Sequence, residues 1–353
     1  MSITVKQGLS GKYFSRNIPD VEVTIGGYRL GVTMETSTDG TSWKEIYNEQ
    51  LYPIDSTVTM GDLGSLLTPY CKQSLIVSLR VTMTEEMLDT TATNTKEMTA
   101  ELVYCEADID TTCDDFTLNH YLSILLGKKI TAVGRLEYLH YTGTDTATVT
   151  AKYSDGSSQS FTATAVGGNS YYTTIEVSAE NYVVEGKTLL AYTVTAGART
   201  QDFVLDLLCP DCAPILIFVN SFGVEELFYC TGTQTKAPSF TRTSAYIDGM
   251  ERNYKIVEKR TFKADTGILN EDMADWFGDL MRSEYVRIVT FNKGTANIGR
   301  EVIITESKSE QTNDPDELPR FTFSYNYSQR NHNVVQMQRE GRIFDNTFDY
   351  TFN

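Results

Sequence analysis

The sequence predicts a mainly β protein, in which two antiparallel β-sandwich modules precede an α+β domain with one clear helix. Three observations support this prediction. Apolar and polar residues alternate along many short segments, turn residues separate these segments, and only one stretch has a convincing helical period. The 353 residues are enough for two or three domains, and 41% of them are apolar, so sizeable hydrophobic cores can form.

The first module is assigned to residues 1–110, where several segments alternate between apolar and polar residues. An alternating strand places one face on a core and the other in water, as in an antiparallel sandwich. Pro69 is expected to end a short helical turn that begins near Gly61. The Thr-rich stretch 86–96 has no apolar period and is predicted to be an exposed loop. The longest alternation consists of Leu75, Val77, Leu79, Val81 and Met83.

A run of acidic residues at 106–115 interrupts the alternation. We interpret this run as a linker or loop between modules. The alternative is a Ca²⁺ site, because hard cations bind several carboxylates at once. The run lacks the Gly and the closing Glu of an EF-hand loop, so the linker interpretation is favoured.

Residues 111–212 are predicted to form a second sandwich of Ig-like architecture. Residues 146–153 alternate between apolar and polar side chains, and a strong hairpin signal follows them at Asp155 and Gly156. Short strands separated by turns about every ten residues are typical of such sandwiches. The disulfide signature of true Ig domains is absent, so the comparison applies to architecture only. Further strands are expected at 172–177, 189–194 and 203–207.

Residues 213–353 are predicted to form an α+β domain with a C-terminal arm. One helix is expected near 270–282, with Asn270 as its N-terminal cap. The apolar segment 343–352 is expected to dock either on its own domain or on a neighbouring subunit. The apolar face of the helix consists of Leu269, Met273, Phe277 and Leu280. Strands are expected at 215–219, 285–289, 302–304 and 321–327.

Cysteine and histidine are sparse. Cys209 and Cys212 form the one CxxC motif, and Cys230 can add a third metal ligand, but no nearby residue completes a site. We interpret the motif as a structural or incidental pair, with metal binding and redox chemistry as alternatives. The three histidines, His120, His140 and His332, lie far apart in the sequence, and His140 is expected to face a strand surface.

The net charge and the absence of catalytic motifs narrow the classes of function that the chain can have. The chain has 30 Lys and Arg against 47 Asp and Glu, a net charge of −17, which argues against specific nucleic-acid binding. No motif of a known catalytic class appears, so we expect no enzyme, no catalytic or metal residue and no cofactor. A glycan hydrolase with two carboxylates is the enzymatic alternative. The 21 Tyr leave a carbohydrate-binding or receptor-binding module as the non-enzymatic alternative.

The sequence also allows a prediction of where the protein is made and whether it spans a membrane. The first residues lack the apolar core of a signal peptide, so we expect synthesis and folding in a cytoplasm. No apolar run approaches the roughly 20 residues that span a bilayer, so we expect no membrane span.

Three stretches together resemble uncharacterised virion structural proteins of tailed phages and prophages that infect Bacteroides-type bacteria. They are residues 218–229 (FVNSFGVEELFY), residues 260–269 (RTFKADTGIL) with the helix after them, and residues 341–349 (GRIFDNTFD). The resemblance implies a tail, hub or baseplate component, made in the host bacterial cytoplasm and located in the virion. It implies a homo-oligomer that contacts other virion proteins, with a host surface glycan as the ligand of the alternative, and it transfers no functional residue.

Overall fold

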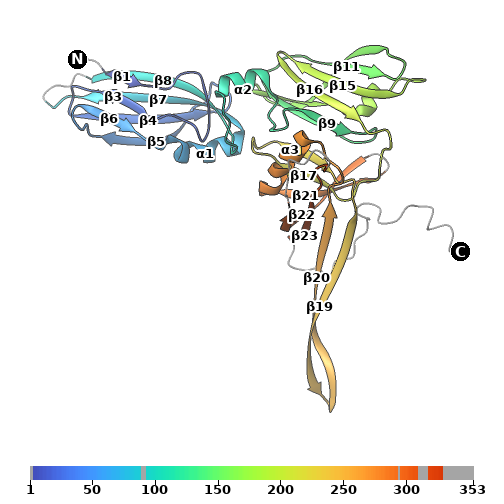
Figure 1. Ribbon diagram of the computed structural model, residues 1–353. Helices are drawn as coiled ribbons and strands as arrows, with labels where there is room; N and C mark the ends of the chain where they lie inside the picture. The colour runs from blue at the N-terminus through green and yellow to red at the C-terminus, as the bar shows by residue number, and fades with distance from the viewer. Residues whose placement is uncertain (1–2, 89–92, 293–294, 309–316, 329–353) are drawn as a thin grey trace.

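The computed structural model describes residues 3–88, 93–292, 295–308 and 317–328. Within these ranges the protein is mainly β, with five sheets and three α-helices, which confirms the predicted fold class. The sheets form three bodies that follow one another along the chain (Figure 1). The predicted boundaries at residues 110 and 212 stay a prediction, and the C-terminal segment 343–352 lies outside the described residues.

The first body is a sandwich of a three-stranded and a five-stranded sheet. Its strands bury alternate residues, as the sequence predicts, and Val23, Leu30 and Val81 from the two sheets meet in one core. The smaller sheet has the order β1 (Thr4–Gln7), β3 (Val21–Thr24), β6 (Thr57–Met60). The larger sheet has the order β2 (Lys12–Phe14), β8 (Thr93–Val103), β7 (Ile76–Glu86), β4 (Arg29–Ser37), β5 (Lys44–Leu51).

Two expectations for this body are wrong. The helix does not stop at Pro69 but continues as α1 (Leu63–Ser74). Proline removes one hydrogen bond from a helix, whereas Leu67 and Cys71 bury the same side of α1 in the sandwich core and hold its last turns in place. The loop expected over residues 86–96 is shorter, because β8 already begins at Thr93 and pairs with β7.

The second body contains a five-stranded and a three-stranded sheet around a core rich in tyrosine. Tyr192 and Phe203 stack at its centre with ring centroids 4.6 Å apart. The larger sheet has the order β12 (Ser158–Thr162), β11 (Ala147–Tyr153), β15 (Leu189–Ala196), β16 (Arg199–Leu205), β9 (Lys128–Thr131). The smaller sheet has the order β10 (Tyr138–Thr142), β14 (Tyr172–Glu176), β13 (Thr164–Gly168).

Each of these two bodies departs from a purely antiparallel sandwich by one pair of strands. In the first body β2 runs parallel to β8, and in the second β9 runs parallel to β16. Both β2 and β9 lie at an edge of their sheets. The acidic run between the bodies is a loop that leads into α2 (Cys113–Asn119), where Thr112 accepts a hydrogen bond from the backbone N–H of Asp115.

The third body is a seven-stranded sheet with α3 (Glu271–Arg282) packed on one face. The predicted helix and its cap are confirmed, because Asn270 accepts a hydrogen bond of 2.8 Å from the backbone N–H of Met273. The strand order is β18 (Glu225–Tyr229), β17 (Ile215–Val219), β21 (Val286–Asn292), β22 (Thr295–Lys308), β23 (Thr322–Tyr327), β20 (Met250–Asp265), β19 (Gln234–Ile247).

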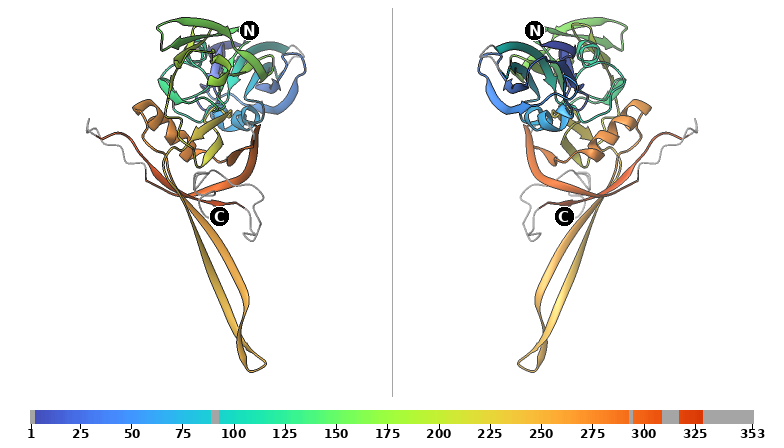
Figure 2. Two further views of the ribbon diagram at one scale, coloured as in Figure 1. Left: turned by 90° about the vertical axis from the view of Figure 1, so that its right-hand side faces the viewer. Right: turned by 90° about the vertical axis from the view of Figure 1, so that its left-hand side faces the viewer.

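A long hairpin, which the sequence analysis missed, extends from this sheet. Strands β19 and β20 are 14 and 16 residues long, and both side views show them projecting far from the three bodies (Figure 2). Asp248 and Gly249 form its turn with φ angles of 53° and 74°, the left-handed conformation that a tight hairpin turn requires. We call residues 234–265 the arm.

The three bodies meet at a cluster of phenylalanines. Phe14 comes from β2, Phe116 from α2, and Phe222 from the turn between β17 and β18. The rings of Phe116 and Phe222 stack 5.2 Å apart, and Phe14 contacts both at 5.8 and 6.2 Å. Each body therefore contributes one buried aromatic side chain to a common joint.

Candidate functional site

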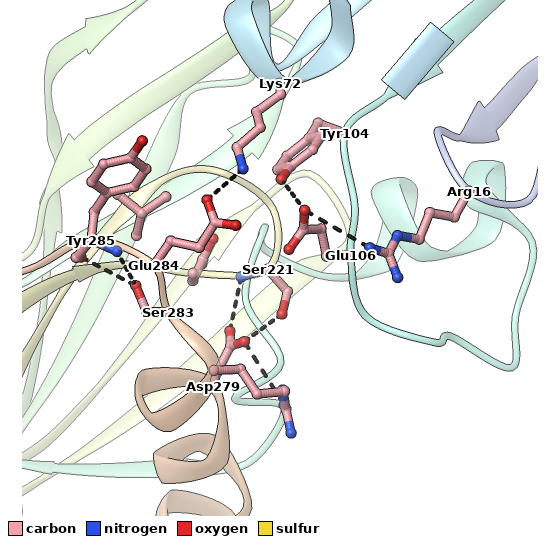
Figure 3. A pocket seen from close by; sticks show the side chains of 12 residues that line it. Arg16, Lys72, Tyr104, Glu106, Ser221, Asp279, Ser283, Glu284 and Tyr285 are labelled. Atoms are coloured by element: carbon pink, nitrogen blue, oxygen red, sulfur yellow. Dashed lines mark hydrogen bonds and ion pairs between the residues drawn. The ribbon is translucent and has the colours of Figure 1, made fainter. Parts of the chain in front are cut away.

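A polar cleft lies between the first and third bodies (Figure 3). It encloses about 300 Å³. The first body contributes Arg16, Lys72, Tyr104 and Glu106, and the third contributes residues 219–221, Asp279 and residues 282–285. The cleft contains three carboxylates, and it is therefore the place to look for acid–base chemistry.

Two of the carboxylates are engaged by side chains of the first body. Lys72 Nζ lies 2.7 Å from Glu284 Oε2, which joins the end of α1 to the segment after α3. The Tyr104 hydroxyl donates a hydrogen bond of 2.6 Å to Glu106, and Arg16 lies 4.0 Å from the same carboxylate. Burial, reinforced by the bond to Glu106, raises the pKa of Tyr104, so this phenol keeps its proton and acts as a donor.

The third carboxylate, Asp279, is buried on α3. It accepts hydrogen bonds from the backbone N–H of Ser221 at 3.0 Å and from the Ser221 hydroxyl. Ser221 precedes Phe222, so Asp279 fixes the turn that places Phe222 in the phenylalanine joint. All three carboxylates thus have structural partners: Glu284 pairs with Lys72 across the two bodies, whereas Glu106 and Asp279 each bind side chains of their own body.

A buried ionic network joins the second and third bodies. Lys129 Nζ on β9 lies 2.6 Å from Glu137 Oε2, accompanied by the carbonyl of Leu227 at 3.4 Å. The same ammonium lies 4.5 Å from the ring of Trp276 on α3, a favourable cation–π position. Trp276 Nε1 in turn donates a hydrogen bond of 2.7 Å to Glu226, whose pKa is raised by complete burial.

His140 is a correction to the sequence analysis. It lies on β10, but β18 of the third body covers it beside an apolar cavity of about 250 Å³, so it is buried rather than on a surface. Nε2 lies 3.0 Å from the carbonyl of Glu225 and must donate to it, so the neutral ring accepts from the Thr174 hydroxyl through Nδ1 at 2.9 Å. Burial lowers the pKa of His140 to about 4.

This lowered pKa predicts a stability loss in mild acid. The unfolded chain binds a proton near pH 6.5 and the folded chain only near pH 4, so His140 stabilises the fold above 6.5 and this contribution is lost as the pH falls. Between pH 7 and about pH 5 the loss should be about 2 kcal/mol relative to His140→Gln, which does not titrate. Urea unfolding of both proteins at the two pH values measures it. Glu226 titrates with the opposite sign in both proteins and cancels, and equal pH dependence of the two would contradict the prediction.

The cysteines are all free thiols. Cys209 is exposed and Cys212 half-buried, and they donate to the carbonyls of Val133 and Pro210 rather than to each other. Burial raises the pKa of Cys212 and of Cys230, so these thiols stay protonated. Among the described residues, no group of three or more His, Cys, Asp or Glu is placed to hold a metal ion, either at this motif or in the acidic run.

The arm is a long exposed element that packs little against the three bodies. Most of its residues are exposed along both strands. The signal in the sequence was the Asp248-Gly249 pair, which is typical of a tight hairpin turn, between two runs that contain Thr, Tyr and Ile. It was missed because the charges along these runs interrupt a clean apolar alternation.

No protein-family model matches the chain, and no curated protein is similar enough to be matched with it. None of the helices in the described ranges is long and apolar enough to cross a membrane. The joints, the arm and the sequence resemblance are therefore the features that bear on function.

Proposed function

We propose that this protein is a structural component of a bacteriophage virion, in the tail, tail hub or baseplate, and that it works by self-assembly. The observation that carries the proposal is the arm, a projecting hairpin whose side chains have few contacts with its own bodies. A monomer gains no stability from ordering such an exposed element, whereas a subunit of an assembly can bury it against a neighbour.

The sheet topology supports the same role. The outer strand of the seven-stranded sheet is β19, so one long edge of the arm has no neighbouring strand in the described part of the chain. Natural proteins seldom leave a long strand edge uncovered, because it pairs readily with another chain. On assembly, a second subunit or another virion protein would cover this edge, so that it would not stay exposed.

The joints between bodies fit a rigid part of a particle. Phenylalanine packing joins all three bodies, while the polar cleft and the buried ionic network each join two of them. We propose that these contacts are non-catalytic and need no cofactor. The proposal includes synthesis in the host bacterial cytoplasm and location in the virion, with other virion proteins as partners and no specific nucleic acid.

Mass spectrometry of purified virions tests this function. Particles from a culture that produces the phage should contain this chain, at a copy number far below that of the major capsid protein and consistent with a ring. The matched control is the lysate fraction from which the particles were separated. Particles that lack the chain while it is abundant in that lysate would reject a virion role.

A carbohydrate-binding or receptor-binding module on a virion or cell surface is the second candidate. Tyr28 and Tyr52 are 48% and 57% exposed, and their rings meet edge to face at 5.4 Å. The Arg29–Glu86 ion pair lies next to Tyr28, because Arg29 follows Tyr28 in the chain and the backbone N–H of Tyr28 donates to the carbonyl of Glu86 at 2.8 Å. This pair offers polar groups to sugar hydroxyls. A glycan array should then show binding that Tyr28→Ala and Tyr52→Ala remove, and an array without wild-type signal would end this candidate.

A further inference from the structure

The arm and the rest of the chain carry opposite net charge. The arm contains seven Lys or Arg and four Asp or Glu, a net charge of +3, so the remainder of the chain carries −20. Both side views show the arm extending away from the three bodies, so most of its length cannot reach the acidic residues of those bodies in its own chain (Figure 2).

The pairing register concentrates the positive charge on one face of the arm. Residues that are directly opposite each other in an antiparallel pair share a face. Four basic residues of β20 lie opposite small residues of β19 on the same face, and no acidic residue is among them. The pairs are Arg252 with Ala245, Lys255 with Thr243, Lys259 with Ser239, and Lys263 with Thr235. We call these four side chains the basic row, which spans roughly 35 Å at the rise of a β-strand.

On the opposite face the acidic residues have partners, and the cations Lys236 and Arg242 lie 5.9 and 5.4 Å from the rings of Phe262 and Phe240. Glu251 lies opposite Tyr246 and accepts a hydrogen bond of 2.6 Å from Ser244. Glu258 lies opposite Phe240 and accepts a hydrogen bond of 2.5 Å from Arg260. In contrast, no residue of the basic row forms an ion pair with a partner in the described ranges. Within the described ranges the basic row therefore gathers on one face four cations of the arm that have neither an ion pair nor an aromatic ring beside them.

The end of the arm is apolar. Tyr246 is 80% exposed and Met250 is 54% exposed beside the Asp248-Gly249 turn, with Tyr254 and Ile247 close by in the same hairpin. Apolar side chains gathered at the end of an exposed element mark a protein contact. A phosphate backbone offers them nothing to pack against, and the acidic bodies would repel it.

We propose that the basic row docks on the acidic body of a second copy of this chain and that the apolar end of the arm packs against the same copy. This inference rests on the proposed self-assembly and names the surface that performs it. The second copy supplies the complementary charge, because its chain outside the arm carries a net charge of −20. Complementary charge of this kind guides association and fixes orientation, while the apolar end contributes buried area.

Light scattering after size exclusion tests the docking with the full chain. The arm variant carries Arg252→Glu, Lys255→Glu, Lys259→Glu and Lys263→Glu. The control variant carries the same change of charge at exposed strand positions away from the arm, as Lys44→Glu, Lys96→Glu, Lys128→Glu and Lys152→Glu. We expect the wild-type chain and the control to self-associate and the arm variant to have a dissociation constant at least about tenfold higher. Added salt should weaken the wild-type assembly in the same direction.

Zero-length crosslinking of wild-type protein gives an independent readout. A carbodiimide joins a lysine amine only to a carboxylate in direct contact, and mixing unlabelled with ¹⁵N-labelled chains separates links between copies from links within one. We expect links between copies from Lys255, Lys259 and Lys263 to Asp or Glu. Arm links found only within one chain would overturn the docking.

The remaining outcomes separate a failure of the docking from a failure of the proposed function. Self-association that the arm variant retains would overturn the docking and leave the proposed self-assembly intact. A wild-type chain that stays monomeric at every concentration would also overturn the docking, while mass spectrometry of virions decides the proposed function separately. A DNA mobility shift that only the arm variant loses would overturn the docking in favour of a nucleic acid.

Discussion

Replacing Lys129 by methionine should lower the free energy of unfolding by about 3–5 kcal/mol, because it leaves the buried carboxylate of Glu137 without its cation. Lys129 and Glu137 are both buried, so water cannot replace the lost partner. The loss should extend to Glu226, whose charged form Lys129 also stabilises. Denaturant unfolding in a Trp43→Phe background measures the effect, since Trp276 then reports alone on this joint.

Two controls separate the buried charge from lost packing. The double variant Lys129→Met with Glu137→Gln should recover much of the loss, because neither partner is then an unpaired charge. Lys6→Met makes the same change in a surface pair, where Lys6 Nζ lies 2.9 Å from Glu22, and should have no measurable effect. If Lys129→Met unfolds like the wild type, the network contributes nothing to the joint.

Replacing Trp276 by alanine should cost about 3–5 kcal/mol as well, for a different reason. Trp276 is completely buried in the core beneath α3, with its ring 5.2 Å from Phe228 and 5.8 Å from Phe218. Truncation would leave a cavity and would also remove the hydrogen bond to Glu226. Circular dichroism during urea unfolding measures the loss without relying on the deleted fluorophore.

The variant Trp276→Phe separates the contribution of ring packing from that of the hydrogen bond to Glu226. It keeps an aromatic ring in the core but removes the Nε1 donor, so the remaining cost should be about 1–3 kcal/mol, the penalty of a buried acceptor without its donor. Raising the pH should enlarge that cost, because the ionised Glu226 then lacks the Trp276 donor and keeps only the hydrogen bond with the Ser123 side chain. Equal losses for the alanine and phenylalanine variants would show that the hydrogen bond rather than the packing dominates.

The prediction from sequence succeeded where one periodic pattern determined an element. The helix at α3 followed from its apolar face and from Asn270, and the strands of the sandwiches followed from alternation. Pro69 misled the prediction because local stereochemistry favours a helix end there, while the burial of Leu67 and Cys71 favours continuation. Packing outweighed the local preference, as it often does for a single unfavourable residue.

The candidate site could be predicted less well than the fold. Lys72 and Glu284 are 212 positions apart in the chain, and Lys129 and Trp276 are 276 − 129 = 147 positions apart. No periodicity relates residues of different bodies, so only the folded chain brings these groups together. The isolated reading of His140 as a surface residue failed for the same reason, since a strand of the third body covers it.

The sequence by itself determined the mainly β class, the helix of the third body and the acidic excess, because local spacing and composition set these features. Only the tertiary structure decided that three bodies meet at one aromatic joint and that β19 and β20 leave the sheet as an arm. It also decided that the basic side chains of the arm share one face. The physical reason is that cross-strand register and burial depend on which segments pair, and that choice is made by the whole chain rather than by any segment.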